Sequence, residues 1–258
     1  MTTIDSRAVV DPKAELHDSV VVGPYAVIGA DVQIGAGTEI GPHVVISGPC
    51  SIGERNKFSP FASIGGDPQD KKYAGEPTRL EIGDDNTVHE YVTISRGTAQ
   101  DEGLTALGSR NWIMAYCHIA HDCMLGSDII MSNTAQLAGH VHLGDHVIMA
   151  GFAKAHQFVK VGHHAFVGMD CTIGQDVPPY VLAGGIPPAP RTINSEGLKR
   201  RGFDDQQLRS LKEAYRIIYR RNLKLDQAMT ELNAGIADNP LWAEMVAFIE
   251  GSERGLLR

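Results

Sequence analysis

The sequence predicts a mainly β protein, a solenoid of short stacked strands followed by a small α-helical domain. Three observations indicate this fold class. Apolar residues recur at every sixth position over most of the chain, glycine is frequent while aromatic residues make up only 6%, and helical spacing replaces the repeat after residue 190. Frequent glycine and few large rings suit tight, repetitive turns better than a core filled by aromatic side chains.

The six-residue repeat extends almost from the first residue to residue 173. Its apolar positions are Val10, Leu16, Val22, Ile28, Ile34, Ile40, Ile46, Ile52, Phe58 and Ile64, then Ile82, Val88 and Ile94, and finally every sixth residue from Leu107 to Ile173. The two interruptions are "GDPQDKKYAGEPTR" at 66–79 and "QDEGLTA" at 100–106. A period of six fits neither a helix nor simple strand alternation, so each unit is a strand and a turn that must stack on its neighbours. We expect this solenoid over residues 1–190, with loops inserted near 66–79 and 100–106.

Repeats of the form aliphatic, Gly, two variable residues, small, variable resemble the hexapeptide repeats of the left-handed parallel β-helix family. The resemblance implies three hexads per coil, about 18 residues, and left-handed winding. Successive coils are then expected about 4.8 Å apart, the ordinary spacing between strands.

Length, charge and hydropathy exclude several classes of protein. No stretch approaches the roughly 20 apolar residues that span a bilayer, and no basic and apolar leader begins the chain, so we expect a cytoplasmic protein without a membrane segment. A formal net charge of −8 argues against binding of nucleic acid.

The segment "CHIAHDC" at 117–123 resembles a small zinc site, but the repeat argues against one. Each cysteine follows an apolar hexad position by four residues, the small inward slot; the cysteines are Cys50, Cys117, Cys123 and Cys171. We therefore expect all four thiols in the core, with no zinc bound by them and no disulfide.

Four histidines fall at outward hexad positions: His118, His121, His140 and His156. Separations of 19 and 16 residues along the last three are close to one coil, so these side chains should line one edge. An imidazole acts as base or acid near neutral pH when a partner fixes its tautomer. The insertion at 66–79 offers Asp70 and Glu76 nearby. The other histidines are expected to be solvated: His17, His43, His89, His142, His146, His163 and His164.

Seven motifs in order, "QDKKYAGEPTR", "VTISRGT", "CHIAHDC", "LAGHV", "AHQF", "QDVPPYV" and "EGLKRRGF", resemble the UDP-N-acetylglucosamine O-acyltransferase family, which begins lipid A synthesis in Gram-negative bacteria. The resemblance covers essentially the whole chain. It implies transfer of a 3-hydroxyacyl group from acyl carrier protein to the sugar 3-hydroxyl of UDP-N-acetylglucosamine. It also implies no metal and no cofactor beyond the phosphopantetheine of the carrier.

The same resemblance assigns roles to residues. It implies that His121 is the general base, Asp70 the carboxylate that orients it, and the N–H of Gly139 the oxyanion donor. The substrate-binding residues that it implies are Gln69, Lys72, His118, His140, His156, Gln157, Asn194, Glu196, Arg200 and Arg201, with Arg200 as a candidate for the phosphopantetheine phosphate.

Two positions depart from the family's pattern. Ser95 stands where the family commonly has His, so a contact made there is in doubt. Met169 stands where Gly would leave room at the end of the acyl tunnel. A filled volume excludes methylenes, so we expect an acyl chain of about ten carbons rather than about fourteen.

After residue 190, apolar stripes at helical spacing predict three or four helices in residues 191–258. The stripes are Leu208, Leu211, Tyr215 and Ile218; Leu225, Ala228, Met229 and Leu232; and Trp242, Met245, Val246 and Ile249. Asn239 is the expected N-cap of the last helix, with Pro240 at its first position. Basic residues gather here in an acidic chain, which favours docking of the acidic acyl carrier protein. The resemblance also implies a homotrimer with sites between subunits.

Other functions remain open at this stage. A related acyltransferase with another sugar-nucleotide acceptor, or an amine in place of the hydroxyl, would share most of these motifs. A zinc enzyme of the hexapeptide carbonic anhydrase type would need three convergent histidines. A solenoid that only binds a partner would leave the edge histidines unexplained.

Overall fold

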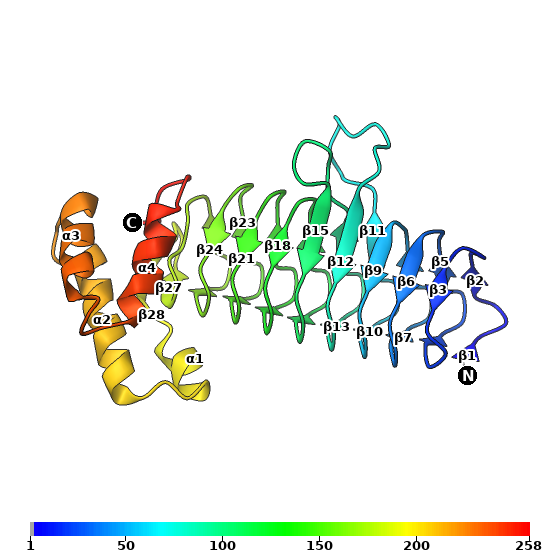
Figure 1. The fold of residues 1–258 in the computed structure, drawn as a ribbon, viewed down its shortest axis with the longest axis horizontal. Coiled ribbons are helices and arrows are strands. Elements are labelled where there is room, and N and C mark those ends of the chain that lie inside the picture. The colour runs from blue at the N-terminus through cyan, green and yellow to red at the C-terminus, as the bar shows by residue number, and fades with distance from the viewer. Residues whose placement is uncertain (1–2) are drawn as a thin grey trace.

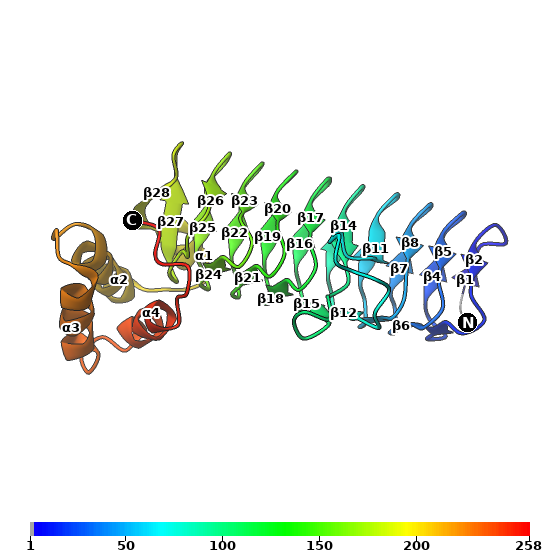
Figure 2. The ribbon, with the colours of Figure 1, turned by 90° about the horizontal axis from the view of Figure 1, so that it is seen from above.

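In a computed structural model, residues 3–258 form a long left-handed parallel β-helix with four helices at its C-terminal end (Figure 1). Viewed from above, the coils stack along one axis, with the N-terminal coil at one end and the helices at the other (Figure 2). The predicted fold class is confirmed.

Three sheets form the sides of the β-helix. The first sheet contains β1 (Thr3–Ile4), β4 (Val21–Val22), β7 (Glu39–Ile40), β10 (Lys57–Phe58), β13 (Thr87–Val88), β16 (Trp112–Ile113), β19 (Ile130–Met131), β22 (Ile148–Met149), β25 (Phe166–Val167), β27 (Val181–Gly184) and β28 (Ala189–Ile193). The second contains β2 (Val9–Val10), β5 (Val27–Ile28), β8 (Val45–Ile46), β11 (Ser63–Gly66), β14 (Thr93–Ser95), β17 (His118–Ile119), β20 (Gln136–Leu137), β23 (Lys154–Ala155) and β26 (Thr172–Ile173). The third contains β3 (Glu15–Leu16), β6 (Val32–Ile34), β9 (Cys50–Ile52), β12 (Arg79–Ile82), β15 (Leu104–Leu107), β18 (Met124–Leu125), β21 (His142–Leu143) and β24 (Lys160–Val161).

Strand register follows the hexads. Ile119 pairs with Leu137, a separation of 18 residues or three hexads. Ile64 pairs with Ile94 and Ile94 with Ile119, so the two coils that carry insertions are longer by 12 and 7 residues. The loops lie at 67–78 (the first insertion) and 96–103 (the second insertion). Residues 104–106, expected in a loop, belong to β15, because their backbone continues the ladder of the third sheet.

The inward positions make a continuous apolar core. The hexad residues Ile113, Ile119 and Leu137 have no exposed surface. All four cysteines are buried and free, at no more than 3% exposed, which confirms their prediction as core residues.

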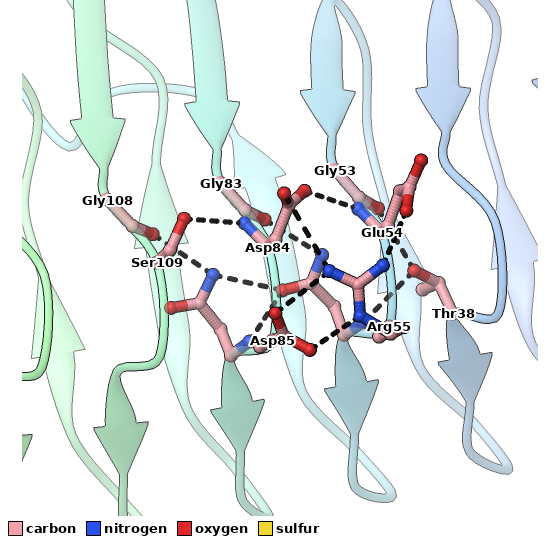
Figure 3. A network of polar contacts seen from close by, with 11 residues as sticks. Thr38, Gly53, Glu54, Arg55, Gly83, Asp84, Asp85, Gly108 and Ser109 are labelled. Carbon is pink, nitrogen blue, oxygen red and sulfur yellow. Dashed lines mark hydrogen bonds and ion pairs between the residues drawn. The ribbon is translucent and has the colours of Figure 1, made fainter.

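A ladder of buried amides supports one corner of the β-helix (Figure 3). The Asn86 side chain donates to Asn56 Oδ1 at 2.9 Å and to the Gly108 carbonyl at 3.1 Å, and its own Oδ1 accepts from the N–H of Asn111 at 2.8 Å. On the outside of the same corner, Arg55 pairs with Asp85 of the next coil at 2.8 Å. Where the coil turns, polar side chains therefore form the hydrogen bonds that satisfy the backbone N–H and C=O groups.

The helical part contains α1 (Ser195–Arg200), α2 (Asp205–Tyr219), α3 (Leu225–Gly235) and α4 (Leu241–Glu250). The predicted stripes lie inward, as Leu211 and Met245 show. Asp204 and Gln207 form a capping box at the start of α2. The expected cap by Asn239 is wrong: the N-cap of α4 is Pro240, and the Asn239 amide instead contacts Ser210 and the Gly235 carbonyl.

The helical part is tied to the β-helix by contacts that the sequence pattern does not reveal. Buried Asp176 accepts from the Lys160 N–H at 2.7 Å and from Ser252 Oγ at 2.6 Å. His163 pairs with Glu244 of α4 at 3.2 Å, and His164 stacks on His146 with ring centroids 4.6 Å apart.

The expectation of solvated side chains is wrong for four of the seven histidines. His89 and His146 are half-buried, and so are His163 and His164, both of which lie at this junction. Burial lowers the pKa of both imidazoles, that of His164 to about 3. Between residues 3 and 258, no helix is both long and apolar enough to cross a bilayer.

Candidate active site

The two insertions leave adjacent coils on the same side of the β-helix and stand beside each other (Figure 1). The strands that follow them are paired, Arg79 with Leu104 in register, so the loops rise from neighbouring rungs. They overhang the corner between β17 and β18, where the chain turns at residues 120–123.

A cleft of about 740 Å³ lies between the insertions and this corner. It is lined by Gln69, Asp70, Lys71, Lys72, Gln100, Asp101, His121, His140, Gln157 and Phe158. A second hollow of about 410 Å³ continues along the second sheet, and its lining includes Gln69, His118, His121, Gly139 and Lys154. The His121 ring lies where the two meet, accessible from both.

His121 is held by the residue that follows it. Its Nδ1 lies 2.7 Å from Asp122 Oδ2, and the Asp122 side chain is only 1% exposed. Thr98 of the second insertion donates to both carboxylate oxygens, through its N–H and its hydroxyl, each at 2.7 Å. Because an ionised carboxylate only accepts, the hydrogen of His121 lies on Nδ1, and Nε2 carries a free lone pair.

The pKa of Asp122 is lower than its ordinary value. Burial by itself would raise this pKa, but the hydrogen bonds from His121 and Thr98 outweigh that effect. The carboxylate is therefore ionised at neutral pH and able to stabilise a positive charge on the His121 ring.

The first insertion, which offers Asp70 and Glu76, is not the only source of carboxylates near these histidines. Within this chain the partner of His121 is Asp122, whereas Asp70 accepts from the Lys72 N–H at 3.0 Å. Asp70 lines the same cleft, and its orienting role stays a prediction. The sequence did contain a signal for Asp122 as the partner of His121. It follows His121 directly in "CHIAHDC", at a corner with φ +59°, and Asp is one of the residues that tolerate this left-handed backbone.

His140 sits between two acids. Its Nδ1 lies 2.7 Å from Asp101 of the second insertion and its Nε2 3.7 Å from Asp122. The ring meets His121 edge-on, with centroids 5.2 Å apart, and stacks on Phe158 at 4.4 Å. Asp101 is a further residue that the sequence reasoning missed, since it lies 39 positions from His140.

The absence of a side chain at Gly139 leaves room for the His121 ring. A Cβ added at residue 139 would lie 2.6 Å from Cε1 and 2.9 Å from Nε2 of the imidazole, closer than real atoms come. The backbone of residue 139 therefore lies directly against the Nε2 edge, which only glycine permits.

The remaining edge histidines differ. His118 contacts Thr93 Oγ1 at 2.7 Å, and burial followed by the charge of His121 lowers its pKa. His156 is exposed and lies 3.4 Å from Arg254. The structure thus places His121 and His140 on the cleft and His118 on the adjoining hollow, and His156 lines neither.

Comparisons with known proteins show the family of this chain. A family model described as "Udp N-acetylglucosamine O-acyltransferase; Domain 2" matches residues 176–257, and hexapeptide repeats match residues 13–48 and 31–66. The acyl-[acyl-carrier-protein]–UDP-N-acetylglucosamine O-acyltransferases of Alkalilimnicola ehrlichii and Herminiimonas arsenicoxydans are 56% and 54% identical, with all of each chain covered. The chain belongs to this family of acyltransferases.

Solved structures in the acyltransferase family superpose along nearly the full length. The UDP-N-acetylglucosamine acyltransferase of Francisella novicida is 41% identical with a TM-score of 0.97, covering 99% of this chain and 94% of that one. The Acinetobacter baumannii structure is 42% identical with a TM-score of 0.96, covering 99% of both chains.

Several residues with predicted roles lie outside the cleft of a single chain. Asn194 is buried and caps α1, accepting from the Gly197 N–H at 3.2 Å and donating to the His164 carbonyl at 3.0 Å. Glu196 and Arg200 are exposed on α1, and Arg201 donates to the Gly197 carbonyl. The amide of Asn194 is thus already satisfied by the fold.

Ser95 and Met169 occupy different environments. Ser95 is buried at 4% exposed, so in this chain it reaches neither hollow. Met169 is 68% exposed on the surface of the single chain. Its predicted limit on acyl length therefore needs a second chain against it.

One group in residues 3–258 has the spacing of metal ligands, namely His121, Asp122 and His140 within 4.8 Å of one another. It contains two imidazoles rather than the three that a zinc enzyme of the carbonic anhydrase type requires. Both oxygens of Asp122 already accept hydrogen bonds from Thr98, which competes with coordination of a cation.

Proposed function

We propose that this protein transfers an acyl group, a 3-hydroxyacyl group by resemblance, from acyl carrier protein to the 3-hydroxyl of UDP-N-acetylglucosamine, the first step of lipid A synthesis. The names of its full-length relatives support the two substrates. The observation that carries the mechanism is the His121–Asp122 pair, which leaves Nε2 free where the two hollows meet.

The chemistry needs one base and one oxyanion donor. Nε2 of His121 removes the proton of the sugar hydroxyl as its oxygen attacks the thioester carbonyl. The tetrahedral intermediate then collapses, the C–S bond breaks, and the carrier thiol leaves with the proton from the imidazolium. Asp122 stabilises that imidazolium without taking its proton.

The backbone N–H of Gly139 is proposed to donate to the oxyanion. It lies on the residue packed against Nε2, so a carbonyl carbon near that nitrogen would place its oxygen beside the same backbone. A preorganised donor of this kind is worth roughly 3 to 4 kcal/mol in the transition state. This mechanism uses no metal and no cofactor other than the carrier's phosphopantetheine.

Both substrates are proposed to meet residues of the two insertions and of α1. Gln69 and Lys72 line the cleft and suit the polar, anionic sugar nucleotide. The exposed Lys199 and Arg200 suit the carrier and its phosphate. We propose a homotrimer in the cytoplasm, in which a neighbouring chain brings its α1 and Met169 to the cleft.

The test is acyl transfer measured with UDP-N-acetylglucosamine and a panel of acyl carriers. His121→Ala should lower kcat by at least about 10²-fold because it removes the base. His43→Ala, at an exposed ring on another corner, is the matched control. Unchanged transfer by His121→Ala would disprove the mechanism, and transfer only to a different sugar nucleotide would correct the acceptor. Metal analysis belongs with this assay, since a stoichiometric zinc ion would favour the metal enzyme.

A further inference from the structure

Arg96, in the motif "VTISRGT", is buried although it is charged. It follows β14 directly, its N–H donates to the Gly66 carbonyl at 2.9 Å, and its side chain is only 8% exposed. A guanidinium removed from water is costly unless its donors are satisfied. Its partners therefore show what it holds in place.

The acceptors of Arg96 fall into two groups. Nη1 donates to the backbone carbonyls of Gly48 at 3.0 Å and Gly65 at 2.6 Å, both on the rigid coils. Nη2 forms an ion pair with Asp67 and donates to the Tyr73 hydroxyl at 3.2 Å. One nitrogen thus contacts the scaffold and the other contacts the first insertion at two points.

The two points on the insertion lie on either side of the residues that line the cleft, Gln69, Asp70 and Lys72. The Tyr73 N–H also donates to the Asp70 carbonyl at 3.0 Å. We propose that Arg96 is the positioning residue of the first insertion, holding its cleft-lining residues over the His121 corner. In its catalytic consequence, this inference depends on the proposed function.

The base itself is held independently of Arg96. Asp122 is fixed by Thr98 and by Thr105, whose hydroxyl accepts from the Asp122 N–H at 2.8 Å. Loss of Arg96 should therefore displace the loop and leave the His121–Asp122 pair in place.

Lysine should not replace this arginine. The planar guanidinium offers five donors in a fixed fork, which lets two nitrogens serve opposite sides at once. The ammonium of lysine presents three donors at a single point. Arg96→Lys should therefore keep the charge but lose the contacts either with the first insertion or with the scaffold carbonyls.

Limited proteolysis with trypsin tests the proposal without reference to activity, because the first insertion carries Lys71 and Lys72. The rate of cleavage after these residues is measured on the full-length protein by mass spectrometry. This rate should be about tenfold higher or more in Arg96→Met, the scale expected for loss of a charged hydrogen bond. Arg55→Met is the matched control, since Arg55 makes an exposed ion pair away from the cleft. An unchanged cleavage rate in Arg96→Met would overturn the proposal.

Two milder variants cover the case in which Arg96→Met does not fold. Tyr73→Phe removes one contact on the loop, and Asp67→Asn removes the negative charge from the other; both leave the buried guanidinium with its scaffold acceptors. Each should accelerate the same cleavage by a smaller factor. No change in either variant would contradict the proposal equally.

Kinetics separate positioning from a merely structural role. Arg96→Met should raise KM for UDP-N-acetylglucosamine about tenfold while the pH profile of kcat stays that of the wild type, because the base is intact. A lower kcat with unchanged KM would indicate only a smaller folded fraction and would refute positioning. If the wild type transfers no acyl group, the proposed function fails, and the proteolysis still decides the role of Arg96.

Discussion

Asp122 links the second insertion to the base, since it accepts from Thr98 on one side and contacts His121 on the other. Its corner conformation, at φ +59°, is one that Asp and Asn tolerate better than other side chains. Asn therefore fits the backbone at residue 122 and removes only the charge and the acceptor pattern.

Asp122→Asn should lower kcat by about 10²- to 10⁴-fold, because an amide neither fixes the Nδ1–H tautomer nor stabilises the imidazolium. Steady-state acyl transfer measures this effect. Asp128→Asn is a close control, since Asp128 has the same φ of +59° at a half-buried corner outside the cleft, where it pairs with Arg110. Equal rates for the two variants would show that His121 is oriented by some other group, for which Asp70 is the candidate.

The same residues show how far single positions can be interpreted from the sequence. Burial of the cysteines followed from the hexad register, since inward and outward positions alternate in a fixed local order. The pairing of His140 with Asp101 did not, because it joins residues 39 positions apart through the shape of a loop.

At the level of structural elements, the buried amide ladder holds the corner where the third sheet turns into the first. Asn86 serves three neighbours there: Asn56, Gly108 and Asn111. Its side chain spans two coil boundaries, so its loss affects the rungs on both sides.

Asn86→Leu should destabilise the protein by about 1 to 3 kcal/mol for each buried partner left without a hydrogen bond. Chemical denaturation followed by circular dichroism measures the free energy of unfolding. Gln33→Leu, at an exposed amide on the third sheet, should change it by less than about 0.5 kcal/mol. A loss of stability no larger at residue 86 than at residue 33 would mean that the ladder is not stabilising.

At the scale of the whole molecule, the junction between the β-helix and the helices should make stability depend on pH. His164 has its pKa lowered to about 3, by burial first and then by the charges of His146, His163 and Arg201. In the unfolded chain the same ring has an ordinary pKa near 6.5. The unfolded state thus binds the proton first, and folding loses stability as the pH falls from about 6.5 towards 3.

His164→Asn should reduce this pH dependence, since Asn tolerates the left-handed backbone at residue 164, where φ is +58°. Urea denaturation at pH 7.5 and at pH 5 compares the two proteins, and His43→Asn, at φ +57°, controls for loss of an exposed ring. If the free energy of unfolding falls by the same amount between pH 7.5 and pH 5 in the wild type and in His164→Asn, His164 is not the source of the pH dependence.

The predicted effect of Met169 on acyl length also belongs to this scale, because Met169 is exposed in one chain. If a neighbouring subunit closes a tunnel over it, Met169→Gly should shift the preference from about ten carbons towards about fourteen, as removal of a filling side chain frees volume for methylenes. Rates with carriers bearing each chain measure the shift. A wild-type preference for fourteen carbons would refute the assignment.

The stacked coils, the core, the approximate places of both insertions and the helical end could all be predicted from the amino-acid sequence. These features follow from local periodicity, in which each hexad specifies which side chain is buried. Three features became visible only in the folded chain: Asp122 and Thr98 hold His121, Arg96 contacts the first insertion, and His164 lies at a junction. Such contacts join different coils through corners and loops, and their geometry depends on backbone conformation and long-range hydrogen bonds that no six-residue pattern encodes.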